Sequence, residues 1–165
     1  MRARRAARSD ASAMAAIYNQ GIEDRVATFE TRARSTAEIE GWFDGIHPFV
    51  VIEEDGRVIA FAATFVYRPR ECYAGIAEAS LYVVRDWRRR GAGRLAMATL
   101  IDAAEEAGFW KLVSRVFPEN AASLRLIESL GFRQVGTYEK HGRLDGVWRD
   151  VVIVERLIPA NLGSH

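Results

Sequence analysis

The chain has 165 residues, 49% hydrophobic and 27% charged, which is the size and composition of one soluble globular domain. Its 23 basic and 22 acidic side chains give a formal net charge of +1, which argues against a nucleic-acid partner. A single cysteine, Cys72, excludes an intrachain disulfide, and the three histidines lack metal-ligand spacing, so we expect no metal site. No apolar stretch approaches the roughly 20 residues that cross a membrane, so we expect a cytoplasmic protein without a membrane partner.

We expect a single domain over residues 1–158 and a C-terminal tail over 159–165, because the sequence contains no repeat and no linker. The tail closes on Gly-Ser-His, which is typical of a remnant added during cloning. In chain order, the pattern first predicts a strand at residues 2–8. A helix then runs from Ser9 or Asp10 to Tyr18, and an irregular stretch follows over 21–34.

A capping box from Ser35 to Glu38 predicts a helix to about Phe43. Asp55-Gly56 between two β-rich segments predicts a hairpin. The segments expected from here on are strands at Phe49–Glu53, Arg57–Tyr67 and Ile76–Val84, a helix from about Ala92 to Ala107, a strand at Trp110–Phe117, a helix from Asn120 or Ala121 to Leu130, and strands at about 132–139 and 147–157. The order β-α-α-β-β-β-α-β-α-β-β predicts a mixed α/β fold of the α+β type, with helices flanking one central, mostly antiparallel sheet.

A turn rich in arginine and glycine, Arg88-Arg89-Arg90-Gly91-Ala92-Gly93-Arg94, separates an expected strand from an expected helix. Helix N-termini attract anions through free N–H groups and the helix dipole, and glycine lets the backbone approach them closely. The turn matches neither the P-loop nor the full dinucleotide-binding pattern. We therefore expect a phosphate or pyrophosphate site, the alternative being a capped helix start with solvated arginines.

The spacing R-x-x-G-x-G at Arg88, Gly91 and Gly93 resembles the acyl-CoA pyrophosphate loop of the GNAT N-acetyltransferases. The run Pro118–Leu124 and the later Leu130-Gly131-Phe132 resemble two further elements of that family, and the resemblance covers nearly the whole chain. Four more segments are similar to its phosphinothricin and arsinothricin acetyltransferase branch, namely 16–19, 27–31, 67–73 and 146–151.

The resemblance implies transfer of an acetyl group from acetyl-CoA to the α-amino group of a small acidic amino acid analogue. Phosphinothricin, arsinothricin and methionine sulfoximine are such compounds. It also implies a homodimer. The cofactor-binding residues that it implies are Leu81, Tyr82, Val83, Arg88, Arg89, Arg90, Gly91, Ala92, Gly93, Arg94, Asn120 and Ser123. The alternative for Asn120 is an ordinary helix cap.

Glu78 is the candidate catalytic residue. Alternation along its expected strand places it on one face with Ile76, Ser80 and Tyr82, among small or apolar neighbours. The resemblance places it at the family's general-base position, acting through a water. The alternative from periodicity alone is an acid on an edge strand that faces solvent.

The expected substrate site is basic and aromatic. Arg70 can grip a carboxylate or phosphinate, Tyr73 can donate a hydrogen bond, and Phe29 corresponds by resemblance to an aromatic wall. Solvated loop charge is the alternative for Arg70. The chain departs from the family at Ile127, where many members have a tyrosine that protonates the leaving thiolate.

Two other functions stay open from the sequence. One is acetylation of a different amine, such as a protein N-terminus or a polyamine, although the basic loop around Arg70 argues against a polycation. The other is a non-catalytic acyl-CoA-binding module, which the absence of the tyrosine allows and the presence of Glu78 argues against. His141 is expected to be a surface loop residue without a catalytic role.

Overall fold

The computed structural model describes residues 1–25 and 27–163. Over these residues, one seven-stranded sheet has the order β1-β2-β3-β4-β5-β7-β6, and its neighbours are antiparallel except for the parallel pair β4–β5. The strands are β1 (Arg2–Arg5), β2 (Phe49–Glu54), β3 (Arg57–Val66), β4 (Ile76–Val83), β5 (Lys111–Val116), β6 (Arg133–Leu144) and β7 (Val147–Leu157). The helices are α1 (Ala11–Asp24), α2 (Thr36–Glu40), α3 (Ala92–Glu106) and α4 (Ala121–Ser129).

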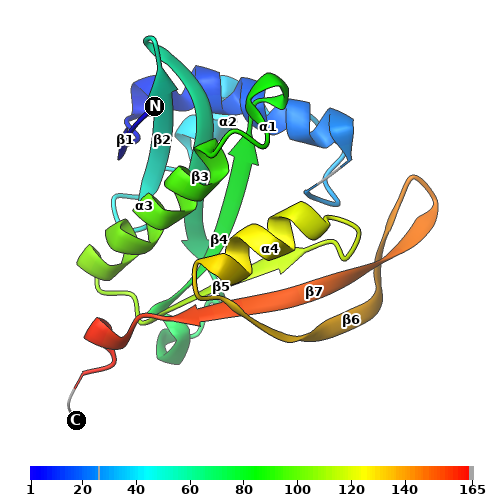
Figure 1. Ribbon diagram of the computed structural model, residues 1–165. Helices are drawn as coiled ribbons and strands as arrows, with labels where there is room; N and C mark the ends of the chain where they lie inside the picture. Colours follow the sequence, from blue (N-terminus) through cyan, green and yellow to red (C-terminus); the bar gives the residue numbers. More distant parts are fainter. Residues whose placement is uncertain (26, 164–165) are drawn as a thin grey trace.

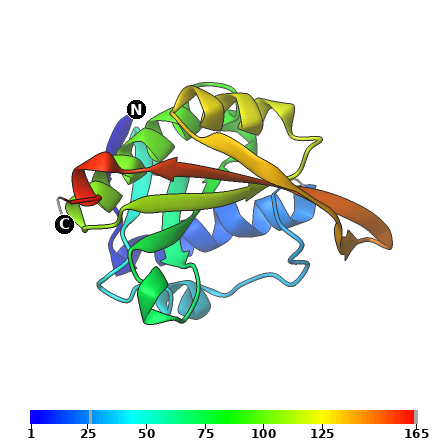
Figure 2. The ribbon, with the colours of Figure 1, turned by 90° about the horizontal axis from the view of Figure 1, so that it is seen from below.

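Helices cover both faces of the sheet, α3 and α4 on one and α1 and α2 on the other (Figures 1 and 2). Successive side chains of β3 point to opposite faces of the sheet and so enter two separate hydrophobic cores. Ala60 belongs to the core with Met97 of α3, and Phe61 belongs to the core with Met14 of α1. The hairpin of β6 and β7 projects from the edge of the sheet (Figure 1). The mixed, mostly antiparallel fold expected from the sequence is confirmed.

The first helix is longer than expected. It continues past Tyr18 to Asp24 and ends at Arg25, whose φ of 56° is left-handed. Ile22 continues the buried stripe, so packing holds the additional turns in place. Asp10 lies at the N-cap position, but its carboxylate accepts from the Ala7 N–H at 2.7 Å instead of capping the helix.

The capping box at Ser35 and Glu38 is present, but α2 ends at Glu40 instead of reaching Phe43. The tail expected from residue 159 begins with a short 3-10 helix, Pro159–Asn161. It docks on the domain, because the Asn161 side-chain amide donates to two backbone carbonyls at 2.8 Å. The expected cloning remnant is Gly-Ser-His at residues 163–165, of which 164–165 lie outside the described residues. Within the described chain, no helix has both the length and the apolarity that a membrane span requires.

Candidate active site

The site begins where β4 and β5 separate. Within the described chain, their parallel pairing covers Ile76 to Glu78 and Lys111 to Val113, and each strand then continues without the other. The Ser114 hydroxyl donates to the Ala79 carbonyl at 2.8 Å at this point. Backbone groups alternate along a strand, so Leu81 and Val83 direct theirs to the same side as Ala79, toward the split. This edge of β4 offers N–H and C=O groups to an extended ligand.

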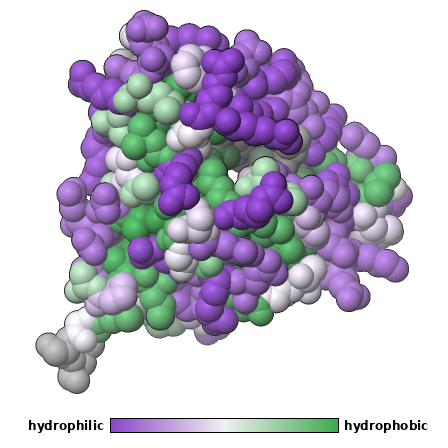
Figure 3. All heavy atoms as spheres, in the orientation of Figure 1, coloured by the Kyte–Doolittle hydropathy of each residue, from purple (hydrophilic) through white to green (hydrophobic). Residues whose placement is uncertain are grey.

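A cavity of about 450 Å³, the split cavity, occupies this separation. A second cavity of about 400 Å³, the α3 cavity, lies against the start of α3. The two share the lining residues Ala27, Leu81, Tyr82, Asn120 and Ser123. Figure 3 shows a hollow near the centre of the face that carries α3 and α4, with hydrophilic groups at its border. Two ligands, or two parts of one ligand, can therefore meet at the shared wall.

Glu78 lines the split cavity, as do Ser80 and Tyr82 from the same face of β4. Its surroundings differ from the expected small and apolar neighbours: Oε1 of Glu78 is 3.3 Å from Nε of Arg115 on β5. Arg115 also lines the cavity. The carboxylate thus lies at the cavity wall with a cation beside it, a feature that we did not predict.

The turn before α3 has the geometry of an anion site. Arg89 and Gly91 have left-handed φ values of 64° and 89°, and Gly91 is the N-cap of α3. The first helical hydrogen bond of α3 runs from the Leu95 N–H to the Gly91 carbonyl at 3.1 Å. The N–H groups that precede Leu95 therefore lie at the N-terminal end of the helix, where a ligand can accept from them. This arrangement concentrates positive potential at the α3 cavity.

Five residues of the turn line the α3 cavity: Arg88, Arg89, Gly91, Gly93 and Arg94. Arg88 also ties the turn to α1, because its guanidinium is 2.7 Å from the Asp24 carboxylate and donates to the Val83 carbonyl at 3.2 Å. Arg90 and Ala92 are absent from the described lining of this cavity. The Arg90 guanidinium lies 5.0 Å from the centre of the Trp87 ring, and Ala92 is buried.

Asn120 and Ser123 lie at the start of α4, on the wall shared by both cavities. The Asn120 side-chain oxygen accepts from the Ser123 N–H at 3.2 Å, which is a helix cap. The two interpretations of Asn120 are therefore compatible, because a cap residue here also faces the ligand space.

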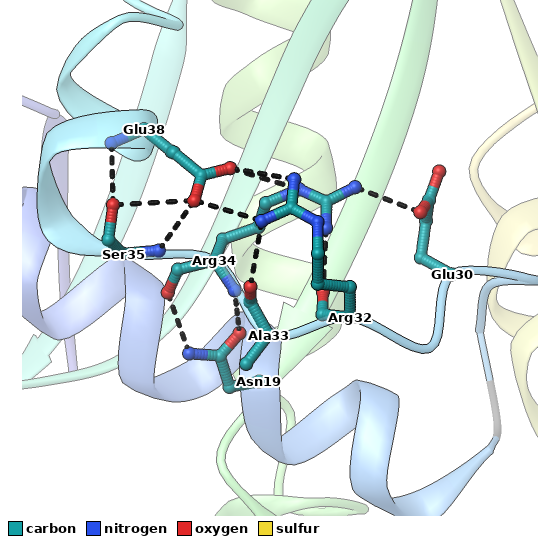
Figure 4. Close-up of polar contacts among 7 residues, drawn as sticks. All are labelled: Asn19, Glu30, Arg32, Ala33, Arg34, Ser35 and Glu38. Atoms are coloured by element: carbon teal, nitrogen blue, oxygen red, sulfur yellow. Dashed lines mark hydrogen bonds and ion pairs between the residues drawn. The ribbon is translucent and has the colours of Figure 1, made fainter.

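The loop between α1 and α2 closes another side of the split cavity and is held by a polar network (Figure 4). The Asn19 amide both accepts from the Arg34 N–H at 2.8 Å and donates to the Arg34 carbonyl at 2.9 Å. Arg34 also donates to Glu30 at 2.8 Å, and Arg32 binds Glu38 through two hydrogen bonds. Since Glu30 lines the cavity, this network fixes one of its walls.

Phe29 lines the split cavity, where its ring meets that of Phe117 edge-on at 5.1 Å. A Cβ added to Gly142 would lie 2.9 Å from the Phe29 ring, so the β6–β7 hairpin packs directly on this aromatic wall. His141 lines the cavity as well and stacks on Tyr138 at 4.5 Å. It is exposed, as expected, but it lies in strand β6 and not in a loop, and it borders the site.

Arg70 and Tyr73 lie elsewhere. Both are exposed at a short 3-10 helix, Glu71–Tyr73, and neither is among the described residues that line the two cavities. The Tyr73 ring instead contacts the Tyr67 ring edge-on at 5.9 Å. The structure thus brings Phe29 to the cavity with Glu78 but leaves the two loop residues outside it.

Two tyrosines, Tyr18 and Tyr82, line the split cavity. Burial raises the pKa of Tyr82 well above its usual value, and burial also raises the pKa of Tyr18. Ile127, the position where the resemblance led us to expect a tyrosine, lines the cavity and is buried. A leaving group at this point therefore meets an apolar side chain.

Comparison with known proteins decides the family. The chain matches the Acetyltransferase (GNAT) family over residues 14–132. It belongs to this family. A phosphinothricin N-acetyltransferase of Alcaligenes faecalis is 33% identical over 160 residues, which cover 94% of this chain and 80% of that protein.

Two solved acetyltransferase structures are similar over almost the full length. An acetyltransferase from Salmonella typhimurium, solved with acetyl-CoA, superposes with a TM-score of 0.92 at 29% identity and covers 100% of this chain and 95% of its own. A ribosomal-protein-alanine N-acetyltransferase from Brucella melitensis gives 0.91 at 30% identity and covers 96% and 100%. The present chain is thus a GNAT acetyltransferase and uses acetyl-CoA.

The residues of this chain fit acetyl-CoA, which supplies an activated acetyl thioester. The α3 cavity offers a helix N-terminus and arginines to a pyrophosphate. The free edge of β4 suits an extended pantetheine arm, and the shared wall leads to Glu78. Among the described residues, no cluster of histidine, cysteine and acidic side chains could hold a metal ion.

Proposed function

We propose that this enzyme acetylates the α-amino group of a small acidic amino acid analogue, such as phosphinothricin, arsinothricin or methionine sulfoximine. The observation that carries the proposal is the position of Glu78, which lines the split cavity next to the wall shared with the α3 cavity. The name of the Alcaligenes faecalis relative supports the choice of substrate.

Glu78 acts as the general base in this proposal. The acceptor amine arrives protonated and loses a proton to Glu78, directly or through a water. The amine nitrogen then attacks the thioester carbonyl carbon, and the C–N bond forms as the C–S bond breaks. The sulfur leaves with its electron pair as a thiolate, and the attacking nitrogen still carries one proton too many for a neutral amide. That proton passes to the thiolate, directly or through solvent, since the Ile127 side chain has no proton to give.

The remaining cofactor and substrate assignments are part of the same proposal. Backbone groups of Leu81 and Val83 bind the pantetheine arm, with Tyr82 between them. The turn before α3 binds the pyrophosphate through the five residues that line the α3 cavity, and Asn120 and Ser123 contact the arm at the shared wall. Arg90 and Ala92, which the resemblance also implied, have no such support from their positions. Arg70 and Tyr73 lie outside the cavities, so of the three substrate residues expected from the sequence only Phe29 has support from its position.

A thiol-release assay with acetyl-CoA tests the proposal. Phosphinothricin, arsinothricin, methionine sulfoximine and glutamate are compared with spermidine and an alanine-initiated peptide. We expect turnover with the first group, and Glu78→Gln should lower kcat about 10²- to 10⁴-fold, the usual contribution of a general base, while acetyl-CoA binding is retained. Faster turnover of the peptide would favour a protein N-terminus, in line with the Brucella melitensis relative.

We also propose that the enzyme is a homodimer in the cytoplasm. Four large apolar side chains of the projecting hairpin are exposed, Val135 and Tyr138 on β6 and Val147 and Trp148 on β7, and exposed apolar side chains are candidates for an interface. Light scattering should give a dimer mass for the wild type and a monomer mass for Trp148→Arg. A wild-type monomer would contradict the proposal, and cell fractionation tests the location.

A further inference from the structure

The split cavity contains an ion pair whose two members come from different strands. Val113 faces Glu78 in the β4–β5 register, and Arg115 is two residues further along β5, so alternation places it on the same face of the sheet. Its Nε lies 3.3 Å from Oε1 of Glu78. The pair therefore depends on the short parallel contact that precedes the split.

Both members of the pair can still take a ligand. The Arg115 side chain is 41% exposed and the Glu78 side chain 27% exposed. Arg115 is the only arginine among the described residues of this cavity, where the other charged or titratable side chains include Glu30 and His141. An anionic group that enters the cavity thus meets one guanidinium, and that guanidinium adjoins the proposed base.

A free α-amino acid carries one positive and one negative charge, which are complementary to Glu78 and Arg115 respectively. Its ammonium and its carboxylate are attached to the same carbon, so the two charges are only a few ångströms apart. If the ammonium binds Glu78, the carboxylate reaches Arg115, whose planar fork can hold both oxygens. The same placement brings the amino nitrogen to the group that must remove its proton.

We propose that Arg115 binds the α-carboxylate of the acceptor, so that this enzyme selects free α-amino acids over amines and peptide N-termini. The inference rests on the proposed function and narrows it. A peptide N-terminus or a polyamine lacks the α-carboxylate and leaves Arg115 paired with Glu78 alone. Arg115 then serves as the specificity residue that the exposed Arg70 was expected to provide.

The test compares L-methionine sulfoximine with its α-carboxamide, in which a neutral amide replaces the carboxylate. We expect the wild-type kcat/KM to be about 10- to 100-fold higher for the free acid, the size of one charge-assisted contact. Arg115→Gln should reduce this ratio to near one, and Arg115→Lys should give an intermediate ratio. Arg57→Gln, an exposed arginine in the β2–β3 hairpin, should keep the wild-type ratio.

Two results would overturn the inference while leaving the proposed function intact. One is an Arg115→Gln enzyme that loses equal activity toward acid and amide, because Arg115 would then only position Glu78. The other is a wild-type ratio near one. Calorimetric binding of acid and amide to each variant in the presence of CoA repeats the comparison without turnover. A wild-type enzyme that acetylates none of the assayed amines would instead overturn the proposed function and the inference together.

Discussion

The Ser114 hydroxyl donates a 2.8 Å hydrogen bond to the backbone carbonyl of Ala79 across the point where β4 and β5 part. Both residues are buried, with 5% and 2% of their surface exposed. This side-chain hydrogen bond thus takes the place of the next backbone hydrogen bond between β4 and β5. The bond holds the two strands at the separation that the split cavity requires.

Removal of this hydroxyl should destabilise the protein. In Ser114→Ala the Ala79 carbonyl is left buried without this donor, which costs about 1–3 kcal/mol of unfolding free energy. Urea unfolding should show a lower midpoint at an unchanged slope. Ser129→Ala is the control: its hydroxyl donates to the Leu126 carbonyl and accepts from Arg94, both in exposed positions, so the change should stay within about 0.5 kcal/mol. Equal stabilities of Ser114→Ala and wild type would contradict the role assigned to the bond.

Gly91 should matter for acetyl-CoA binding because its φ of 89° is left-handed and begins α3. A side chain in that conformation costs about 1–2 kcal/mol, so Gly91→Ala should shift the turn and raise KM for acetyl-CoA about tenfold. Gly56→Ala carries the same kind of strain at φ 76° in the β2–β3 hairpin, with open space around it. Steady-state kinetics should show that Gly56→Ala leaves KM unchanged. A similar KM in both variants would count against a role for the turn.

Gly75 lies against the face of Trp110. A Cβ built at Gly75 would come within 2.0 Å of the indole ring, and the backbone N–H of Trp110 donates to the Gly75 carbonyl at 2.8 Å. Gly75→Ala should therefore lower the unfolding free energy by about 1–3 kcal/mol or more through overpacking. In a Trp110→Ala background the same substitution should cost much less. Urea unfolding of the four proteins measures this coupling, and additive effects would contradict it.

The sequence predicts the parts of this site that depend on neighbours in the chain. The capping box at Ser35, the hairpin at Asp55-Gly56 and the glycine turn at Gly91 are local patterns, and each lies where the pattern places it. The face occupied by Glu78 also follows from alternation along one strand.

The contact between Arg115 and Glu78 could not be predicted from the sequence, for a physical reason. On its own strand Arg115 lies in an alternating segment, which is equally compatible with a solvated face. Its contact with Glu78 exists only because β5 pairs beside β4 over three residues. Arg70 shows the reverse error: it is eight residues from Glu78 in the chain, yet the 3-10 helix at Glu71–Tyr73 leaves it exposed and outside the cavity.

The network around Glu38 should make the cavity loop sensitive to acid. Hydrogen bonds from Arg32 and from the Ser35 N–H, in that order, lower the pKa of Glu38 to about 2 from a usual value of 4.5. A carboxyl group with a lowered pKa in the folded state stabilises that state fully above its unfolded value. That stabilisation is lost as the pH falls from about 4.5 toward 2.

Glu38→Gln isolates this contribution. We expect the variant to melt below the wild type at pH 6, and we expect the difference in Tm to vanish near pH 2. Because Arg32 and Glu38 are exposed to solvent, 0.5 M salt should also shrink the difference at pH 6. Thermal melts by circular dichroism at both pH values provide the measurement. A difference in Tm that is constant with pH would show that Glu38 stabilises the loop through contacts independent of its charge.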